Sequence, residues 1–95
     1  MGQEELRQAY FEVMLQEPGT TLEAFMLRVQ AGEFGPQPRE VVERFLRWVE
    51  GAVLSSIQTR AGANPDAAPE AEALAEAKRE EIAALIARFA PRPRT

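Results

Sequence analysis

The chain has 95 residues and a net charge of −4, with 15 acidic and 11 basic side chains, and 45% of its residues are hydrophobic. This length fits one domain, the hydrophobic content exceeds that of disordered proteins, and the acidic balance lacks the basic footprint of nucleic-acid-binding proteins. Cysteine and histidine are both absent from the sequence, which excludes disulfides, thiolate chemistry, the usual zinc sites and the imidazole base of ordinary catalytic triads.

The first predicted helix covers residues 3–17. Its apolar residues recur at spacings of three and four, which is the pattern of one face of an amphipathic helix. Phe11 and Leu15 lie beside this stripe and widen it. Pro18 and Gly19 then end the helix with strong turn chemistry. The stripe consists of Leu6, Ala9, Tyr10, Val13 and Met14.

A second, shorter helix is predicted over residues 21–31. Thr20 and Glu23 match a capping box, in which the two side chains accept hydrogen bonds from backbone N–H groups at the start of a helix. Gly32 closes the helix. Because the connection between the first two helices is short, we expect them to pack as an antiparallel hairpin. Phe34 follows in a proline-stiffened loop, where we expect it to fold back over the core, with an exposed contact as the alternative.

The longest predicted helix covers residues 38–61, and the rest of the chain is organised around it. Pro38 fits the first turn of a helix, and Gly62 fits its end. At about 100° per residue, the apolar side chains fall in one arc roughly 180° wide. A helix with so wide an apolar arc needs neighbours on at least two sides, as in a bundle. The arc consists of Val41, Val42, Phe45, Leu46, Trp48, Val49, Ala52, Val53 and Ile57.

The composition changes after the long helix. From Gly62 to Ala77 the only large apolar residue is Leu74, so we predict a flexible link over residues 62–69. The last helix is predicted over residues 69–90, with its apolar residues concentrated late, and residues 91–95 form a loose tail after the proline stop. Its seam is spaced three and four like a short coiled-coil strip and consists of Ala75, Lys78, Ile82, Leu85 and Phe89.

These patterns together predict an all-α fold. It is a small four-helix bundle with one long central helix, a helical hairpin before it and an amphipathic C-terminal helix after a flexible link. The long helix presents more apolar surface than the two short helices can cover. The last helix therefore either folds back over it in the same chain or meets it in a second chain, and the link permits both, including an exchange of last helices.

The surplus apolar surface predicts a non-enzymatic protein–protein interaction module, such as a small adaptor, a chaperone-like protein or a regulatory subunit. We expect it to self-associate as a homodimer through the long and C-terminal helices. Trp48 lies at the edge of the apolar arc, where core packing is favoured over an interface role. The candidate residues for a partner or dimer interface are Trp48, Phe34, Ile82, Leu85, Ile86 and Phe89.

No residue pattern indicates a catalytic, cofactor-binding or metal-binding site. The six glycines are scattered and form no phosphate-binding motif, and no serine lies in a nucleophile elbow. A di-iron bundle would need Glu-x-x-His motifs, which a chain without histidine lacks. An enzyme that relies on glutamate alone is the remote alternative.

The nearer alternative is a DNA-binding transcriptional regulator. In this interpretation the second and third helices form a helix-turn-helix-like pair, and Arg39, Arg44 and Arg47 lie near the start of the helix that reads the DNA. Glutamates alternate with these arginines, among them Glu40 and Glu43, and would face phosphates. We therefore do not expect nucleic acid to be the partner.

The sequence also carries signals of compartment and origin. The first residues, MGQEELR, lack the basic and apolar regions of a signal peptide, and no apolar run approaches the roughly 20 residues that span a bilayer. We therefore expect a cytoplasmic protein with no membrane association. Ten of the eleven bases are arginine and 14 of the 15 acids are glutamate, a bias typical of GC-rich bacterial coding sequences.

Overall fold

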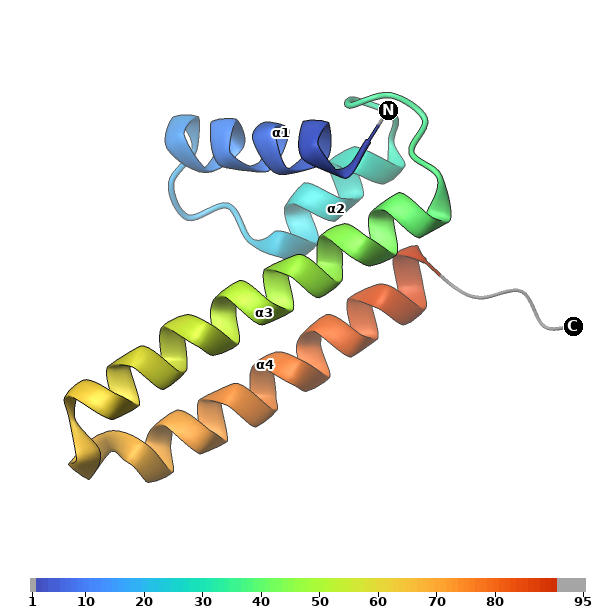
Figure 1. Cartoon of the computed structure of the whole chain (residues 1–95). Helices are drawn as coiled ribbons and strands as arrows, with labels where there is room; N and C mark the ends of the chain where they lie inside the picture. Colours follow the sequence, from blue (N-terminus) through green and yellow to red (C-terminus); the bar gives the residue numbers. More distant parts are fainter. Residues whose placement is uncertain (1, 91–95) are drawn as a thin grey trace, which may run out of the picture.

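The computed structural model describes residues 2–90, and this part of the chain is all-α (Figure 1). The prediction of an all-α chain with four α-helices is therefore confirmed. The predicted loose tail, residues 91–95, lies outside the described residues. The elements in chain order are α1 (Gln3–Gln16), α2 (Leu22–Gln30), α3 (Arg39–Ala63), the short 3-10 helix η1 (Pro65–Ala67) and α4 (Ala68–Phe89).

Helix α4 folds back along α3, so the two longest helices form an antiparallel hairpin (Figure 1). Helices α1 and α2 cover only the first half of α3. Beyond that point α3 and α4 accompany each other alone (Figure 1). We call residues 54–76 of this two-helix segment the stalk, because they lie between Val53 and Lys78, which still line a hollow with Leu22 of α2. The chain therefore covers its central helix by its own C-terminal helix, which is one of the two arrangements considered from the sequence.

The connection between α3 and α4 differs from the predicted flexible link over residues 62–69. Gly62 has no left-handed backbone, and α3 continues through it to Ala63. The helix ends at Asn64 because the following residue, Pro65, disfavours the helical conformation of its predecessor and has no N–H to donate. Asn64 is accordingly extended, with φ −138° and ψ 91°. The turn is then closed within three residues by η1, so the link is short and helical.

The start of α2 also differs from the prediction, by one residue. Thr21, and not Thr20, is the cap, because its hydroxyl oxygen accepts a 3.1 Å hydrogen bond from the N–H of Ala24. The Thr20 hydroxyl instead donates to the carbonyl oxygen of Glu17 at 2.9 Å. It is therefore already committed to the turn that follows α1, in which Gly19 has φ 97°.

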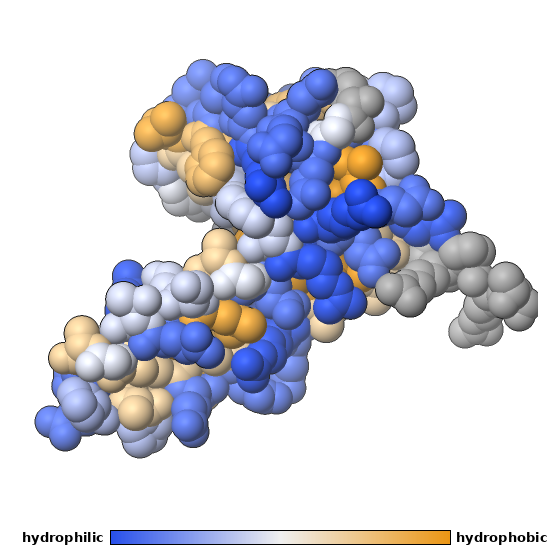
Figure 2. Space-filling view, in the orientation of Figure 1, coloured by the Kyte–Doolittle hydropathy of each residue, from blue (hydrophilic) through white to orange (hydrophobic). Residues whose placement is uncertain are grey.

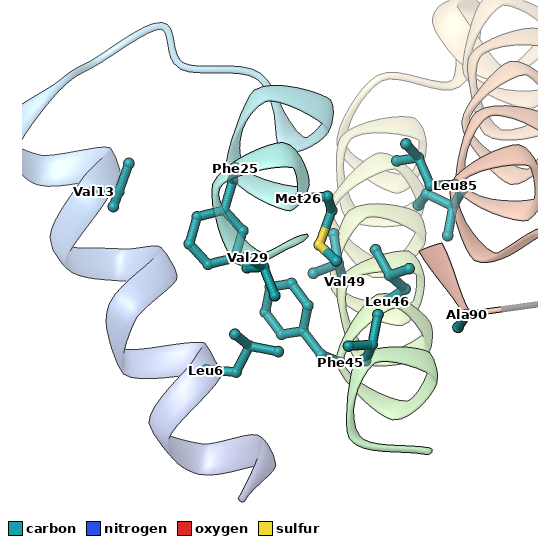
Figure 3. Close-up of a cluster of buried hydrophobic side chains, with 12 residues drawn as sticks. Leu6, Val13, Phe25, Met26, Val29, Phe45, Leu46, Val49, Leu85 and Ala90 are labelled. Atoms are coloured by element: carbon teal, nitrogen blue, oxygen red, sulfur yellow. The ribbon is translucent and has the colours of Figure 1, made fainter. Parts of the chain in front are cut away.

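The core lies where α1 and α2 meet the first half of α3 and the end of α4 (Figure 3). Phe45 of α3 is fully buried between the other helices, and its ring is 5.6 Å from that of Phe25 of α2. The half-buried Tyr10 of α1 lies edge-on to both rings, at 5.1 Å from Phe25 and 5.6 Å from Phe45. Helices α1 and α2 thus contact each other mainly through side chains that also contact α3. The most deeply buried large side chains are Phe25, Phe45, Leu6, Met26 and Leu46.

Candidate interaction surface

Two large apolar side chains of α1 remain in solvent. Phe11 is 52% exposed and Leu15 is 81% exposed. They are four residues apart on one helix and therefore lie on the same face, one turn from each other. Figure 2 shows apolar surface gathered at the end of α1 that leads into α2. Because most large apolar residues of a small domain are covered, an adjacent exposed pair identifies a candidate binding surface.

The rotation of α1 on the core explains this exposure. Leu6 and Val13, seven residues apart, are both buried and fix which side of the helix faces α3. At 100° per residue, Phe11 and Leu15 then lie more than a quarter turn away from the buried side. The start of α1 is held to α3 by a 3.2 Å hydrogen bond from the Gln3 side-chain amide to the carbonyl oxygen of Arg44.

Trp48 extends the exposed pair onto α3. Its ring meets that of Phe11 almost at right angles, with 5.7 Å between the ring centroids. On its inner side it lies 6.1 Å from the buried Phe45 ring, and the guanidinium of Arg7 lies over it at 4.6 Å. Trp48 is therefore half-buried, with one side in the core and the other in the surface. We call Phe11, Leu15 and Trp48 the apolar patch.

A groove between α1 and α3 borders the patch on the Trp48 side. Arg7, Arg44 and Arg47 line it together with Trp48. Glu40 and Glu43 also line this groove, nearer the start of α3. Two of the three arginines singled out for the nucleic-acid alternative, Arg44 and Arg47, are thus exposed side by side along one groove. Arg39 is exposed at the first position of α3, before that groove.

The remaining interface candidates from the sequence are placed in or over the core of the same chain. Ile82 and Leu85 of α4 are 2% and 5% exposed and face the core, so they are not surface residues of the folded chain. Ile86 and Phe89 are partly buried against that same core. Among the interface candidates on α3 and α4, only Trp48 lies beside the exposed pair of Phe11 and Leu15.

Phe34 covers the core as expected. Its ring lies 5.2 Å from that of Phe25, and the Arg28 guanidinium lies over it at 5.5 Å. Arg28 also donates to Glu33 at 3.0 Å and to Glu17 at 3.1 Å. The hydrogen bond with Glu33 is the main reason why the pKa of Arg28 is raised. These contacts fasten the loop after α2 over the core and leave Phe34 half-buried.

In the described part of the chain, no three acidic side chains gather closely enough to hold a metal ion. A hollow of about 290 Å³ beside Met26, Val42 and Phe89 is lined by apolar side chains, glutamines, glycines and a proline, without an acid or a base. The half-buried phenol of Tyr10 has its pKa raised by burial, which leaves it protonated at neutral pH.

The sequence patterns did not identify Phe11 and Leu15 as surface residues, although both lie beside the main apolar stripe of α1.

Comparison of the chain with protein-family models, with curated proteins and with solved structures gave no match. Within residues 2–90, none of the helices combines the length and the apolar character that a bilayer crossing requires.

Proposed function

We propose that the chain is a non-enzymatic protein–protein interaction module that binds through the apolar patch of Phe11, Leu15 and Trp48. A small adaptor, a chaperone-like protein and a regulatory subunit all belong to this class. The proposal includes the cytoplasmic location that the sequence predicts. Helices α2 and α4 then serve to hold α1 and α3 in fixed relative positions, so that the patch is presented on two rigid elements.

The single observation that carries this proposal is the exposure of Leu15 and Phe11 directly beside a tryptophan. Transfer of apolar surface out of water contributes about 25 cal/mol per Å², so burying the exposed parts of these side chains would contribute on the order of 3 kcal/mol. Aromatic residues at the centre of such patches are the usual energetic anchors of interfaces. The groove beside the patch adds charged groups that can orient a partner.

Affinity capture from the host cell tests the proposal, with the tagged chain compared in three forms. The test variant is Phe11→Gln with Leu15→Gln, which removes the exposed apolar surface without touching a buried residue. The matched control is Leu74→Gln, because Leu74 is also exposed, at 44%, but lies on the stalk. Circular dichroism of all three confirms that the fold is unchanged.

The expected result is a bound protein, either a host protein or an untagged second copy, that the test variant loses and that Leu74→Gln retains. If the three forms capture the same proteins in the same amounts, the patch is not the binding surface and the proposal fails.

One observation favours nucleic acid as a second candidate function, namely the exposure of Arg44 and Arg47 along one groove. Phosphate contacts by these residues would make duplex binding strongly salt-dependent. Fluorescence anisotropy of a mixed-sequence duplex at low salt tests this, with Arg44→Gln and Arg47→Gln expected to weaken any binding. An unchanged anisotropy would exclude this function.

A further inference from the structure

The apolar patch lies between an acidic and a basic edge. On α1, Glu5 and Glu12 are exposed beyond Leu15, on the side turned away from Trp48. On α3, Arg44 and Arg47 are exposed beyond Trp48. Glu40 and Glu43 limit this basic edge to the stretch from Arg44 to Arg47.

Each edge has a charge that lacks an ion pair within residues 2–90. In the described residues, neither Glu12 nor Arg47 takes part in an ion pair or a side-chain hydrogen bond. Elsewhere in the described residues most basic side chains are paired, as Arg7 is with Glu4 at 3.1 Å and Lys78 is with Glu81 at 3.1 Å. Unpaired charges of opposite sign therefore flank the exposed apolar side chains.

A surface of this kind is complementary to itself. In an interface with two-fold symmetry, each residue that contacts a second position is itself contacted from that position in the other copy. A two-fold axis that lies in the interface and runs along the apolar patch, parallel to its two edges, sets the acidic edge of each copy against the basic edge of the other. It also stacks the two apolar patches on each other at the centre.

We propose that the occupant of the patch is a second copy of this chain, in a symmetric dimer. Phe11 and Leu15 meet the partner's apolar patch, and Glu12 faces Arg47 of the partner subunit. This inference rests on the proposed function and names its partner. The interface differs from the one expected from the sequence, because it uses α1 and the first half of α3 and leaves α4 in its own chain.

Other occupants fit the charges less well. A dimer formed through α1 alone would set Glu5 and Glu12 against the same acids of the other copy. A basic amphipathic helix from another protein would be attracted to Glu12, but its basic side chains would be repelled by Arg44 and Arg47. The stalk of a second copy carries four acids and one base, so it would set like charges against Glu5 and Glu12. The acids are Asp66, Glu70, Glu72 and Glu76, and the base is Arg60.

Charge exchange tests the pairing directly. Glu12→Arg and Arg47→Glu are prepared as separate proteins, and the dimer dissociation constant is measured by sedimentation velocity. Each variant alone should dimerise about tenfold more weakly than the wild type, because both symmetric pairs become like-charged. An equimolar mixture of the two should regain dimers of nearly wild-type affinity, because every edge pair in the mixed dimer is again opposite in sign.

Two further proteins complete the experiment. The variant Phe11→Gln with Leu15→Gln should be monomeric at tens of micromolar, while Leu74→Gln should dimerise like the wild type. Because all these positions are exposed, circular dichroism should show unchanged helix content.

Three results would overturn the inference: a wild type that is monomeric at tens of micromolar, a dimer that tolerates loss of Phe11 and Leu15, or a mixture no tighter than its components. If the wild type is monomeric but a host protein is still captured through the apolar patch, the proposed function stands and only the second copy is excluded. If neither is bound, both proposals fail.

Discussion

The guanidinium of Arg88, one residue before the end of α4, donates a 2.7 Å hydrogen bond to the carboxylate of Glu23 in the first turn of α2. The two residues are 65 positions apart in the chain. Their ion pair joins the last helix to the second one at the edge of the core. The carboxylate also lies at the positive end of the α2 dipole, which favours a negative charge there.

This ion pair should contribute little to stability, because both side chains are more than half exposed and are screened by water and salt. Arg88 also lies over the Phe89 ring at 5.1 Å, so a single replacement removes more than the pair. A double-mutant cycle with Arg88→Ala and Glu23→Ala isolates the energy of the ion pair itself. The coupling energy between the two side chains should be about 0.2–1 kcal/mol. The measurement is urea unfolding, and a coupling that is insensitive to salt would contradict this account.

Two leucines that differ mainly in burial provide a test of where the core lies. Leu46 is fully buried on α3, and Leu74 is 44% exposed on the stalk. Leu46→Ala should lower the free energy of unfolding by about 2–5 kcal/mol, since it removes packed atoms and leaves a cavity. Leu74→Ala should lower it by less than about 1 kcal/mol. Equal losses in denaturant unfolding would show that the stalk contributes as much as the core.

The observed cap of α2 makes a prediction opposite to that of the sequence pattern. Thr21→Ala removes the acceptor for the N–H of Ala24 and should destabilise the protein by about 1 kcal/mol. Thr20→Ala removes only a hydrogen bond to the Glu17 carbonyl oxygen in the turn and should have the smaller effect. Thermal unfolding of both variants gives the order, and a larger loss for Thr20→Ala would restore the original capping box.

The fold class followed from the sequence because burial on α3 repeats with the helical period. Val42, Phe45, Leu46 and Val49 were expected on one arc, and all four are buried in the structure. The end of α3 did not follow, because a glycine such as Gly62 is compatible with both a helix interior and a helix end. The Asn64–Pro65 pair sets the end of α3, because a proline disfavours the helical conformation of the residue before it.

The candidate surface could be predicted only in part. The apolar residues of α1 span a wider arc than one contact covers, and no local rule states which part of that arc α3 will bury. The Tyr10 ring packs against the buried Phe25 and Phe45 rings, whereas the ring of its neighbour Phe11 meets those of Tyr10 and Trp48, both of which are only partly buried. Ile82 and Leu85, which the sequence suggested for an interface, are buried in their own chain, because the short connection folds α4 back along α3.

Tyr10 makes stability depend on pH in the alkaline range. Burial raises the pKa of its phenol above the ordinary value of 10.0, so above that pH the unfolded chain loses this proton more readily than the folded one. The contribution of the protonated Tyr10 phenol to the free energy of unfolding is fully present below pH 10.0. It is lost as the pH rises through the higher folded-state pKa. Tyr10 is the only tyrosine, so phenolate absorbance reports it directly. Tyr10→Phe should show a shallower alkaline loss of stability, and identical profiles would contradict the prediction.

Gly51 offers a stabilising substitution in the exposed side of α3. It has a helical backbone in the interior of that helix, and a Cβ atom added there would meet nothing within 4 Å. Gly51→Ala should therefore raise the free energy of unfolding by about 0.5–1 kcal/mol, because alanine loses less backbone entropy in a helix.

Gly19 is the matched control, since a Cβ atom there would also meet open space but the residue has φ 97°. Gly19→Ala should destabilise by about 1 kcal/mol, because an L side chain strains the left-handed backbone. Urea unfolding of both variants measures the difference, and a loss of stability in Gly51→Ala would mean that this face of α3 is already covered in solution.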